Sequence, residues 1–221
     1  MKVIIFGATG MVGQSALREC LLDDKVQEIL IIGRKRAVTE HKKIKQIELE
    51  NVADLSSIEH DITGFDACFF SLGVSSAGMK EEEYTKITYD ITLSVAKKLS
   101  GLNPQMTFIY VSGRGTDSSE KGRSMWARVK GKTENDLLRL PFKAAYMFRP
   151  GLIIPLNDVK SKTKLYQLVY DTLKPVYPLL KKLNGVITSE QVGKAMIHVA
   201  SNGYSDPLIE SQEIKKISML I

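Results

Sequence analysis

Residues 2–13 read Lys-Val-Ile-Ile-Phe-Gly-Ala-Thr-Gly-Met-Val-Gly, an apolar run that leads into three glycines. The β-branched run at 2–7 predicts a strand buried on both faces. Helical spacing of apolar residues at 11–22 predicts a helix directly after the glycines. A strand, a glycine-rich turn and a helix in this order open a βαβ unit, in which such a turn binds the pyrophosphate of a dinucleotide.

Each glycine of the turn has its own expected role. Gly7 permits the tight turn, Gly10 lets the backbone approach a pyrophosphate, and Gly13 permits close packing of helix against strand. The N-terminus of the helix offers free N–H groups and the positive end of its dipole to the phosphates. We therefore expect cofactor contacts along the whole turn, from Gly7, Ala8, Thr9, Gly10, Met11, Val12 and Gly13. The alternative is a tight strand–helix turn that holds no ligand.

Strand and helix patterns continue to alternate along the chain. Further strands are expected at 27–33, 44–50, 66–72, 106–112 and 144–148, and helices at 81–100 and 125–140. Six strands separated mainly by helices predict a parallel sheet covered on both faces, with right-handed crossovers. The prediction is a doubly wound α/β fold (a Rossmann fold) with three layers, α/β/α, in which residues 1–221 form a single domain.

Residues 157–221 are predicted to form a small, mostly helical C-terminal subregion that covers the substrate cleft, with an amphipathic helix at 189–200. The stretch 162–183 combines apolar residues at helical intervals with lysines. Two other roles therefore stay open for it, a dimer face in a homodimer and a basic amphipathic helix on a membrane surface. Pro175 and Pro178 break this helix into short pieces, which weakens the membrane alternative.

Composition narrows the function classes. The net charge is +6 over 221 residues, but the basic residues are scattered and do not interleave with aromatic ones, so nucleic-acid binding is disfavoured. No apolar run is long enough to span a bilayer. The two cysteines lack the spacing of a metal site, and no metal ligand set is expected. Without a recognisable signal peptide before the first strand, we expect a cytoplasmic location.

The end of the second predicted strand indicates which dinucleotide is bound. NAD sites usually place Asp or Glu here, on the ribose 2′-hydroxyl. This strand ends Ile-Gly-Arg-Lys-Arg at 32–36, and the guanidinium of Arg34 can bind a 2′-phosphate that a carboxylate would repel. We therefore predict NADP as the cofactor, with a solvated basic loop as the alternative. Asn51, after the third strand, is expected near the adenine ring.

The glycine pattern resembles that of extended and atypical short-chain dehydrogenase/reductase enzymes. Within that superfamily the chain looks like the Tat-interacting oxidoreductase-like proteins and bacterial NAD-dependent epimerase/dehydratase-like relatives. The resemblance covers nearly the whole chain, and the stretches that carry it are Phe-Gly-Ala-Thr-Gly-Met-Val-Gly (6–13), Phe-Ser-Leu-Gly (70–73), Val-Lys-Gly-Lys-Thr-Glu (129–134), Phe-Arg-Pro-Gly (148–151) and Gly-Lys-Ala-Met (193–196). It implies a doubly wound sheet and, usually, NADP.

The resemblance also implies a reaction centre made of a serine and a Tyr-x-x-x-Lys motif. There the lysine lowers the pKa of the tyrosine one helical turn away, and the serine polarises the substrate carbonyl. Ser112 and Lys130 match the serine and the lysine, but Trp126 stands where the tyrosine belongs. Because indole does not ionise near neutral pH, Trp126 cannot do the acid–base work of a tyrosine.

Two further loops are expected at the carboxyl ends of the strands, where ligands lie in such sheets. Leu72 and Gly73 would pass under the ribose and nicotinamide, and Pro150 and Gly151 would meet the carboxamide edge through their backbones. Lys130 would contact both cofactor and substrate. Arg114, beside Ser112, is either a partner for an anionic substrate or an ordinary surface residue.

These residues leave two main hypotheses. The first is an NADP-dependent oxidoreductase or epimerase-like enzyme that acts on a small carbonyl or hydroxyl compound. The second is a catalytically impaired NADP-binding regulatory or interaction protein, because Trp126 replaces the tyrosine. A third and weaker reading is reduction of a flavin-like or quinone acceptor. Tyr84, Tyr89 and Tyr110 are candidates for a substitute acid, although none has the expected spacing.

Overall fold

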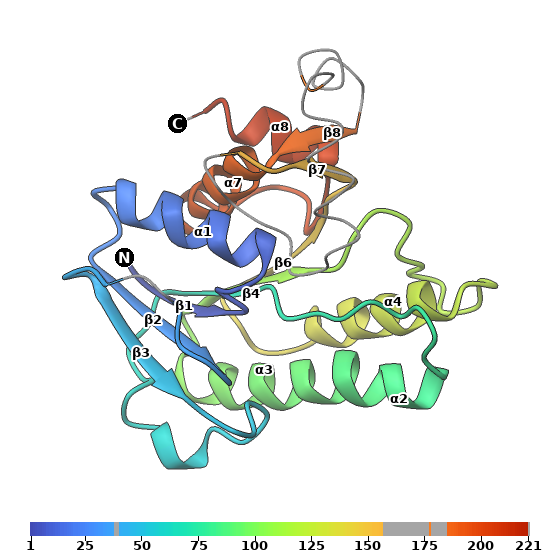
Figure 1. The fold of residues 1–221 in the computed structure, drawn as a ribbon, viewed down its shortest axis with the longest axis horizontal. Coiled ribbons are helices and arrows are strands. Elements are labelled where there is room, and N and C mark those ends of the chain that lie inside the picture. The colour runs from blue at the N-terminus through green and yellow to red at the C-terminus, as the bar shows by residue number, and fades with distance from the viewer. Residues whose placement is uncertain (38–39, 157–176, 178–184, 221) are drawn as a thin grey trace.

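The computed structural model describes residues 1–37, 40–156, 177 and 185–220. These residues form a seven-stranded, all-parallel sheet in the order β3-β2-β1-β4-β5-β6-β9 (Figure 1). Its strands are β1 (Lys2–Phe6), β2 (Glu28–Gly33), β3 (Ile44–Glu48), β4 (Ala67–Phe70), β5 (Thr107–Val111), β6 (Ala144–Arg149) and β9 (Leu208–Glu210). The predicted doubly wound α/β fold is confirmed.

Helices cover both faces of this sheet. On one face lie α1 (Met11–Leu22) and α7 (Ser189–Asn202), and on the other lie α3 (Ile91–Leu102) and α4 (Met125–Leu137) (Figure 1). Alternate side chains of β1 enter the two cores: Val3 and Ile5 pack on the α1 side, and Ile4 and Phe6 on the α3 side. This two-sided burial explains why the strand is apolar at every position from Val3 to Phe6.

The long helix predicted at 81–100 has three parts. An α-helical turn, α2 (Glu81–Thr85), leads through a π-helical turn (Lys86–Asp90) into α3, which extends to Leu102. The helix predicted at 125–140 ends earlier, since α4 closes at Leu137. Pro141 prevents the helix from extending to 140, because a proline disfavours helical backbone in the residue before it.

The described C-terminal residues 185–220 are mostly helical, as predicted, and they also contain two short strands that were not predicted. The helix predicted at 189–200 is α7, which begins with a capping box between Thr188 and Gln191, and it is followed later by α8 (Ser211–Ile217). In addition β7 (Leu152–Ile154) pairs with β8 (Val186–Thr188) in a two-stranded sheet, and β9 joins the main sheet. Strands of three residues are too short to show a period in the sequence. Apart from Tyr177, the amphipathic stretch 162–183 lies outside the described residues.

A glycine lets α7 pack closely against α1. A Cβ on Gly193 would lie 2.8 Å from the carbonyl oxygen of Ser15 and 2.6 Å from Cγ of Glu19. Glu19 is itself buried in this contact, where burial raises the pKa of its carboxyl group even though it pairs with Arg18. The separation of the two helices is therefore set by the absence of a side chain at position 193.

Replacing Gly193 by Ala is expected to lower the free energy of unfolding by about 1–3 kcal/mol, because the added methyl group forces the two helices apart. Gly101→Ala in α3 is the matched control, since a Cβ there meets no atom within 4 Å. The control should be neutral or stabilising by up to about 1 kcal/mol, the usual gain of alanine over glycine in a helix. Urea unfolding of both variants measures the difference, and equal stabilities would contradict the packing argument.

Candidate functional site

The glycine-rich turn follows β1 and opens α1. Gly7 has a φ of +82°, and a Cβ there would lie 2.8 Å from the backbone carbonyl group of Ser71. A Cβ on Gly13 would lie 2.1 Å from the carbonyl oxygen of Gly7. The turn closes through a hydrogen bond from the Gly10 amide to the Gly7 carbonyl, 2.9 Å long. These contacts give the turn the compact shape on which the predicted pyrophosphate contacts depend.

No side chain caps the N-terminus of α1, whose N-cap residue is Gly10. The first amides of a helix have no acceptor within the helix, so those of Met11, Val12 and Gly13 can bind an anion. A cavity of about 430 Å³ lies in front of the turn. Its lining comes from the ends of β1, β2 and β4 and consists of Gly7, Ala8, Thr9, Ile31, Ile32, Gly33, Arg34, Lys35 and Leu72.

The cationic lining of this cavity is exposed and unpaired. Within the described part of the chain, no carboxylate forms an ion pair with Arg34 or Lys35, and both side chains are exposed. Lys35 was not singled out from the sequence, although it lies in the same basic run. Of the other predicted contacts, Leu72 lines the cavity. Several predicted contacts do not line it, among them Gly10, Met11, Val12, Gly13, Asn51 and Gly73. The side-chain oxygen of Asn51 instead accepts the amide of Ala53 at 3.1 Å.

Ser112 and Lys130 come together at the carboxyl end of β5. Lys130 lies on α4 and its Nζ donates a hydrogen bond to the carbonyl oxygen of Ser112. Burial lowers the pKa of Lys130 to about 8, although the Glu134 carboxylate nearby favours the charged form. An amine with this pKa carries a proton at neutral pH and can still release it, which suits acid–base chemistry.

A buried ion pair, not anticipated from the sequence, lies behind Ser112. The Ser112 hydroxyl donates to the carboxylate of Glu134, and the guanidinium of Arg149 binds the same carboxylate through Nε at 3.0 and 3.1 Å and through a further bond from Nη2. Glu134 is fully buried and Arg149 nearly so. Because Glu134 follows Lys130 by four residues on α4, helical spacing was the available signal.

Trp126 lies one turn before Lys130 on α4. Its indole packs on the loop after Ser112, since a Cβ on Gly115 would lie 3.5 Å from Cη2 of the ring. Lys130 and Trp126 therefore both contact the segment that begins at Ser112.

The alternative tyrosines are occupied elsewhere. Tyr110 is buried in the core, where burial raises its phenol pKa, and burial also raises the pKa of Tyr84. Tyr89 donates to Asp136 at 2.6 Å, which raises its pKa too. None of these phenols is held in a form that would transfer a proton readily near neutral pH.

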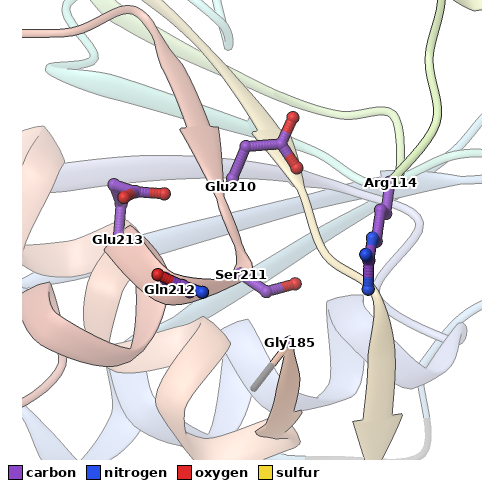
Figure 2. A pocket seen from close by; sticks show the side chains of 6 residues that line it. All are labelled: Arg114, Gly185, Glu210, Ser211, Gln212 and Glu213. Carbon is purple, nitrogen blue, oxygen red and sulfur yellow. The ribbon is translucent and has the colours of Figure 1, made fainter.

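The backbone of Pro150 and Gly151 is engaged within the protein. The Pro150 carbonyl accepts the amide of Arg114 at 2.9 Å, and the Gly151 amide donates to the hydroxyl of Ser211 at 2.7 Å. These bonds tie the end of β6 to the loop after Ser112 and to the start of α8. A second cavity opens beside them, lined in part by Arg114 and Ser211 (Figure 2).

The described residues carry neither a metal-binding cluster nor a membrane-spanning helix. Among these residues no group of three or more His, Cys, Asp or Glu side chains could hold a metal ion. Their helices include none with the length and apolar character needed to cross a membrane.

Comparison with known proteins places this geometry in context. No protein-family model matches the chain. "Protein FMP52-1, mitochondrial" of Scheffersomyces stipitis is 24% identical, over 100% of this chain and 98% of that protein. "Protein HTATIP2" of Rattus norvegicus is 26% identical, over 69% and 63%.

Among solved structures, Gre2 of Candida albicans in complex with NADPH has a TM-score of 0.71 and 14% identity, covering 95% of this chain and 77% of Gre2. WbmF of Bordetella bronchiseptica in complex with NAD⁺ has a TM-score of 0.69 and 13% identity, covering 99% and 76%. The chain shares the fold of these two proteins, which were solved with NAD⁺ and NADPH. The resemblance predicted from the sequence is confirmed by these neighbours and by the HTATIP2 relative.

One expectation is corrected by the comparisons. The FMP52 relatives are named as mitochondrial proteins, which contradicts the cytoplasmic location expected from the sequence. Composition carries no information that separates compartments with similar redox conditions.

The ion pair behind Ser112 yields a stability prediction. Glu134→Ala is expected to lower the free energy of unfolding by about 3–5 kcal/mol, because it leaves the buried Arg149 guanidinium unpaired. Glu82→Ala is the control, since Glu82 forms an exposed pair with Lys86 and should cost about 1 kcal/mol or less. Adding Arg149→Met to Glu134→Ala should recover part of the loss in urea unfolding. Similar losses for Glu134→Ala and the control would refute a structural role for the pair.

Proposed function

We propose that this protein binds NADP and exchanges a hydride with a small substrate that carries a hydroxyl or carbonyl group. One observation carries the proposal: the cavity of the glycine turn and the Ser112–Lys130 pair lie at the same end of one parallel sheet. Ligands of such sheets bind beyond the carboxyl ends of the strands, at the point where the strand order reverses, which here lies between β1 and β4. Neighbours of this fold that were solved with NAD⁺ or NADPH support a dinucleotide in this place.

The residues present fit such a cofactor. The turn from Gly7 to Gly13 would hold the pyrophosphate through backbone amides, with Leu72 against the ribose. Arg34 and Lys35 line the same cavity, and the described chain provides no carboxylate to neutralise them. A guanidinium binds a phosphate through two parallel hydrogen bonds, so this pair favours the 2′-phosphate of NADP over the 2′-hydroxyl of NAD.

Arg34→Ala is expected to weaken NADP⁺ binding by about tenfold or more while leaving NAD⁺ binding nearly unchanged, because only NADP⁺ carries the 2′-phosphate. Arg36→Ala is the matched control, as Arg36 is exposed in the same loop and does not line the cavity. Isothermal titration calorimetry of the variants with both nucleotides measures the effect. Equal affinities of the unaltered protein for NADP⁺ and NAD⁺ would defeat the assignment of Arg34.

Lys130 takes the place of the missing tyrosine in this proposal. Its ammonium has three hydrogens, and only one is used by the Ser112 carbonyl. Below about pH 8 Lys130 can donate a proton to a developing alkoxide, and above it the neutral amine can accept one from an alcohol. NADP, when bound, supplies or takes up the hydride.

Ser112 has a different role from the serine of the resemblance. Both groups around its hydroxyl, the Glu134 carboxylate and the Phe148 carbonyl, are acceptors. The single Ser112 proton is therefore held by Glu134, and its oxygen is left to accept a hydrogen bond. A substrate hydroxyl matches this arrangement better than a carbonyl does.

A second candidate is an NADP-binding regulatory or interaction protein without turnover. The observation that favours it is Trp126, whose ring packs against Gly115 where the resemblance expects a phenol. Loss of a general acid removes a factor of about 10²–10⁴ in rate, so the two candidates differ in whether Lys130 compensates.

Trp126→Tyr is expected to raise turnover by about 10²-fold, because it restores an ionisable group one helical turn from Lys130. The measurement is NADPH oxidation with a panel of small aldehydes and ketones, recorded as a function of pH. In the unaltered protein the reduction rate should fall as the pH rises through about 8, where Lys130 loses its proton. Lys130→Met should abolish that fall. A Trp126→Tyr variant that still binds NADPH but gains no rate would favour the regulatory candidate.

A further inference from the structure

The second cavity, of about 320 Å³, lies beyond the ends of β6 and β9 (Figure 2). Its lining is formed by Arg114, Gly185, Glu210, Ser211, Gln212 and Glu213. Arg114 follows Ser112 by two residues, so the Cα atoms of these two residues are at most about 7 Å apart. Arg114 thus connects the cavity to the loop that follows Ser112.

Two glycines make room for the Arg114 side chain. A Cβ on Gly151 would lie 3.4 Å from Cδ of Arg114, and one on Gly185 would lie 3.0 Å from Nη1. Gly185 also has a φ of +87°, which side chains rarely adopt. The guanidinium thus occupies a defined place at one wall, and no carboxylate of the described residues pairs with it. Arg114 is exposed to solvent, and its guanidinium lies against the two glycines at this wall.

The opposite wall carries the acidic groups. Figure 2 shows Glu210 and Glu213 across the cavity from Arg114. Glu210 already pairs with Arg149, at 3.5 Å, whereas Glu213 has no cationic partner among the described residues. The lining therefore carries one guanidinium and two carboxylates, and Glu213 is the carboxylate that has no cationic partner among the described residues.

Ser211, between these walls, is buried. Its oxygen accepts the Gly151 amide at 2.7 Å, so its own proton remains available for an acceptor in the cavity. Arg114 and Ser211 together offer donors on one side, and Glu213 offers an acceptor on the other. A ligand with a single negative charge would be attracted by Arg114 but repelled by Glu213.

We propose that this cavity binds a zwitterion, with its carboxylate at Arg114 and Ser211 and its ammonium group at Glu213. The proposed function requires a hydroxyl group on the substrate, and this inference rests on that function. A zwitterion that carries a hydroxyl group is a small hydroxylated amino acid. Its oxidation breaks the carbinol C–H bond, whose electron pair leaves as hydride to NADP⁺, and the O–H bond, whose proton goes to neutral Lys130. A carbonyl group forms, and NADP⁺ becomes NADPH.

The experiment compares three probes that share a hydroxyl group and differ in charge. L-Serine carries both charges, 3-hydroxypropanoate lacks the ammonium group, and ethanolamine lacks the carboxylate. Each is titrated into the full-length protein at constant ionic strength, and the Nε–H signal of Arg114 is followed by NMR. L-Serine should shift this signal saturably and bind at least about tenfold more tightly than either partial probe, a gap that corresponds to one charge-assisted contact.

Variants test each charge separately. Arg114→Gln should weaken L-serine binding about tenfold, whereas Arg123→Gln, an exposed arginine that does not line the cavity, should leave it unchanged. For these variants, binding is read from the signals of L-serine itself. Glu213→Gln should weaken L-serine and strengthen 3-hydroxypropanoate, because the repelling carboxylate is gone. Equal affinities for all three probes, or unchanged L-serine binding in Arg114→Gln, would overturn the proposal.

Thermal shift with NADP⁺ on the same samples keeps the two proposals apart. Stabilisation by NADP⁺ without selective L-serine binding would refute the zwitterion site and leave the proposed function standing. Selective L-serine binding without any effect of NADP⁺ would support the site and refute the proposed function.

Discussion

The contact between the backbone of Gly7 and the bare Cα of Gly13 fixes the geometry on which both cavities depend. A Cβ at Gly13 would lie 2.1 Å from the Gly7 carbonyl oxygen, so α1 can start against β1 only without that side chain. Helix α1 in turn sets the position of α7 through the close approach at Gly193. Because α7 follows directly from β8, this series of contacts runs from the glycine turn to Gly185 in the second cavity.

Around Ser112 the constraint is electrostatic. A carboxylate and a guanidinium that are both buried must remain paired, since either alone would lie in a poorly solvated interior. The pair links α4 to β6. Because a carboxylate can only accept hydrogen bonds, the Ser112 hydroxyl donates its proton to Glu134. Glu134 and Arg149 therefore determine whether the Ser112 hydroxyl donates or accepts, without any contact of their own with a substrate.

The two cavities recognise charge in different ways. The first combines backbone amides with Arg34 and Lys35, and it presents only positive charge to a ligand. The second places Arg114 opposite Glu210 and Glu213, so positive and negative charge lie apart within one cavity. A cavity with only positive charge attracts any anion. A cavity with separated positive and negative charges favours a ligand whose own charges have a matching spacing.

The fold and the cofactor turn could be predicted from the sequence because their signals are local. The apolar run at 2–6, the three glycines after it and the basic run at 34–36 each act within a few neighbouring residues. Ser112, Trp126 and Lys130 were identified by the resemblance to a known pattern, and their role in a reaction stays a prediction. The three-residue strands β8 and β9, the Glu134–Arg149 pair and the place of Arg114 could not be predicted in this way. Each depends on segments far apart in the chain, and only tertiary packing decides which of them share a buried space.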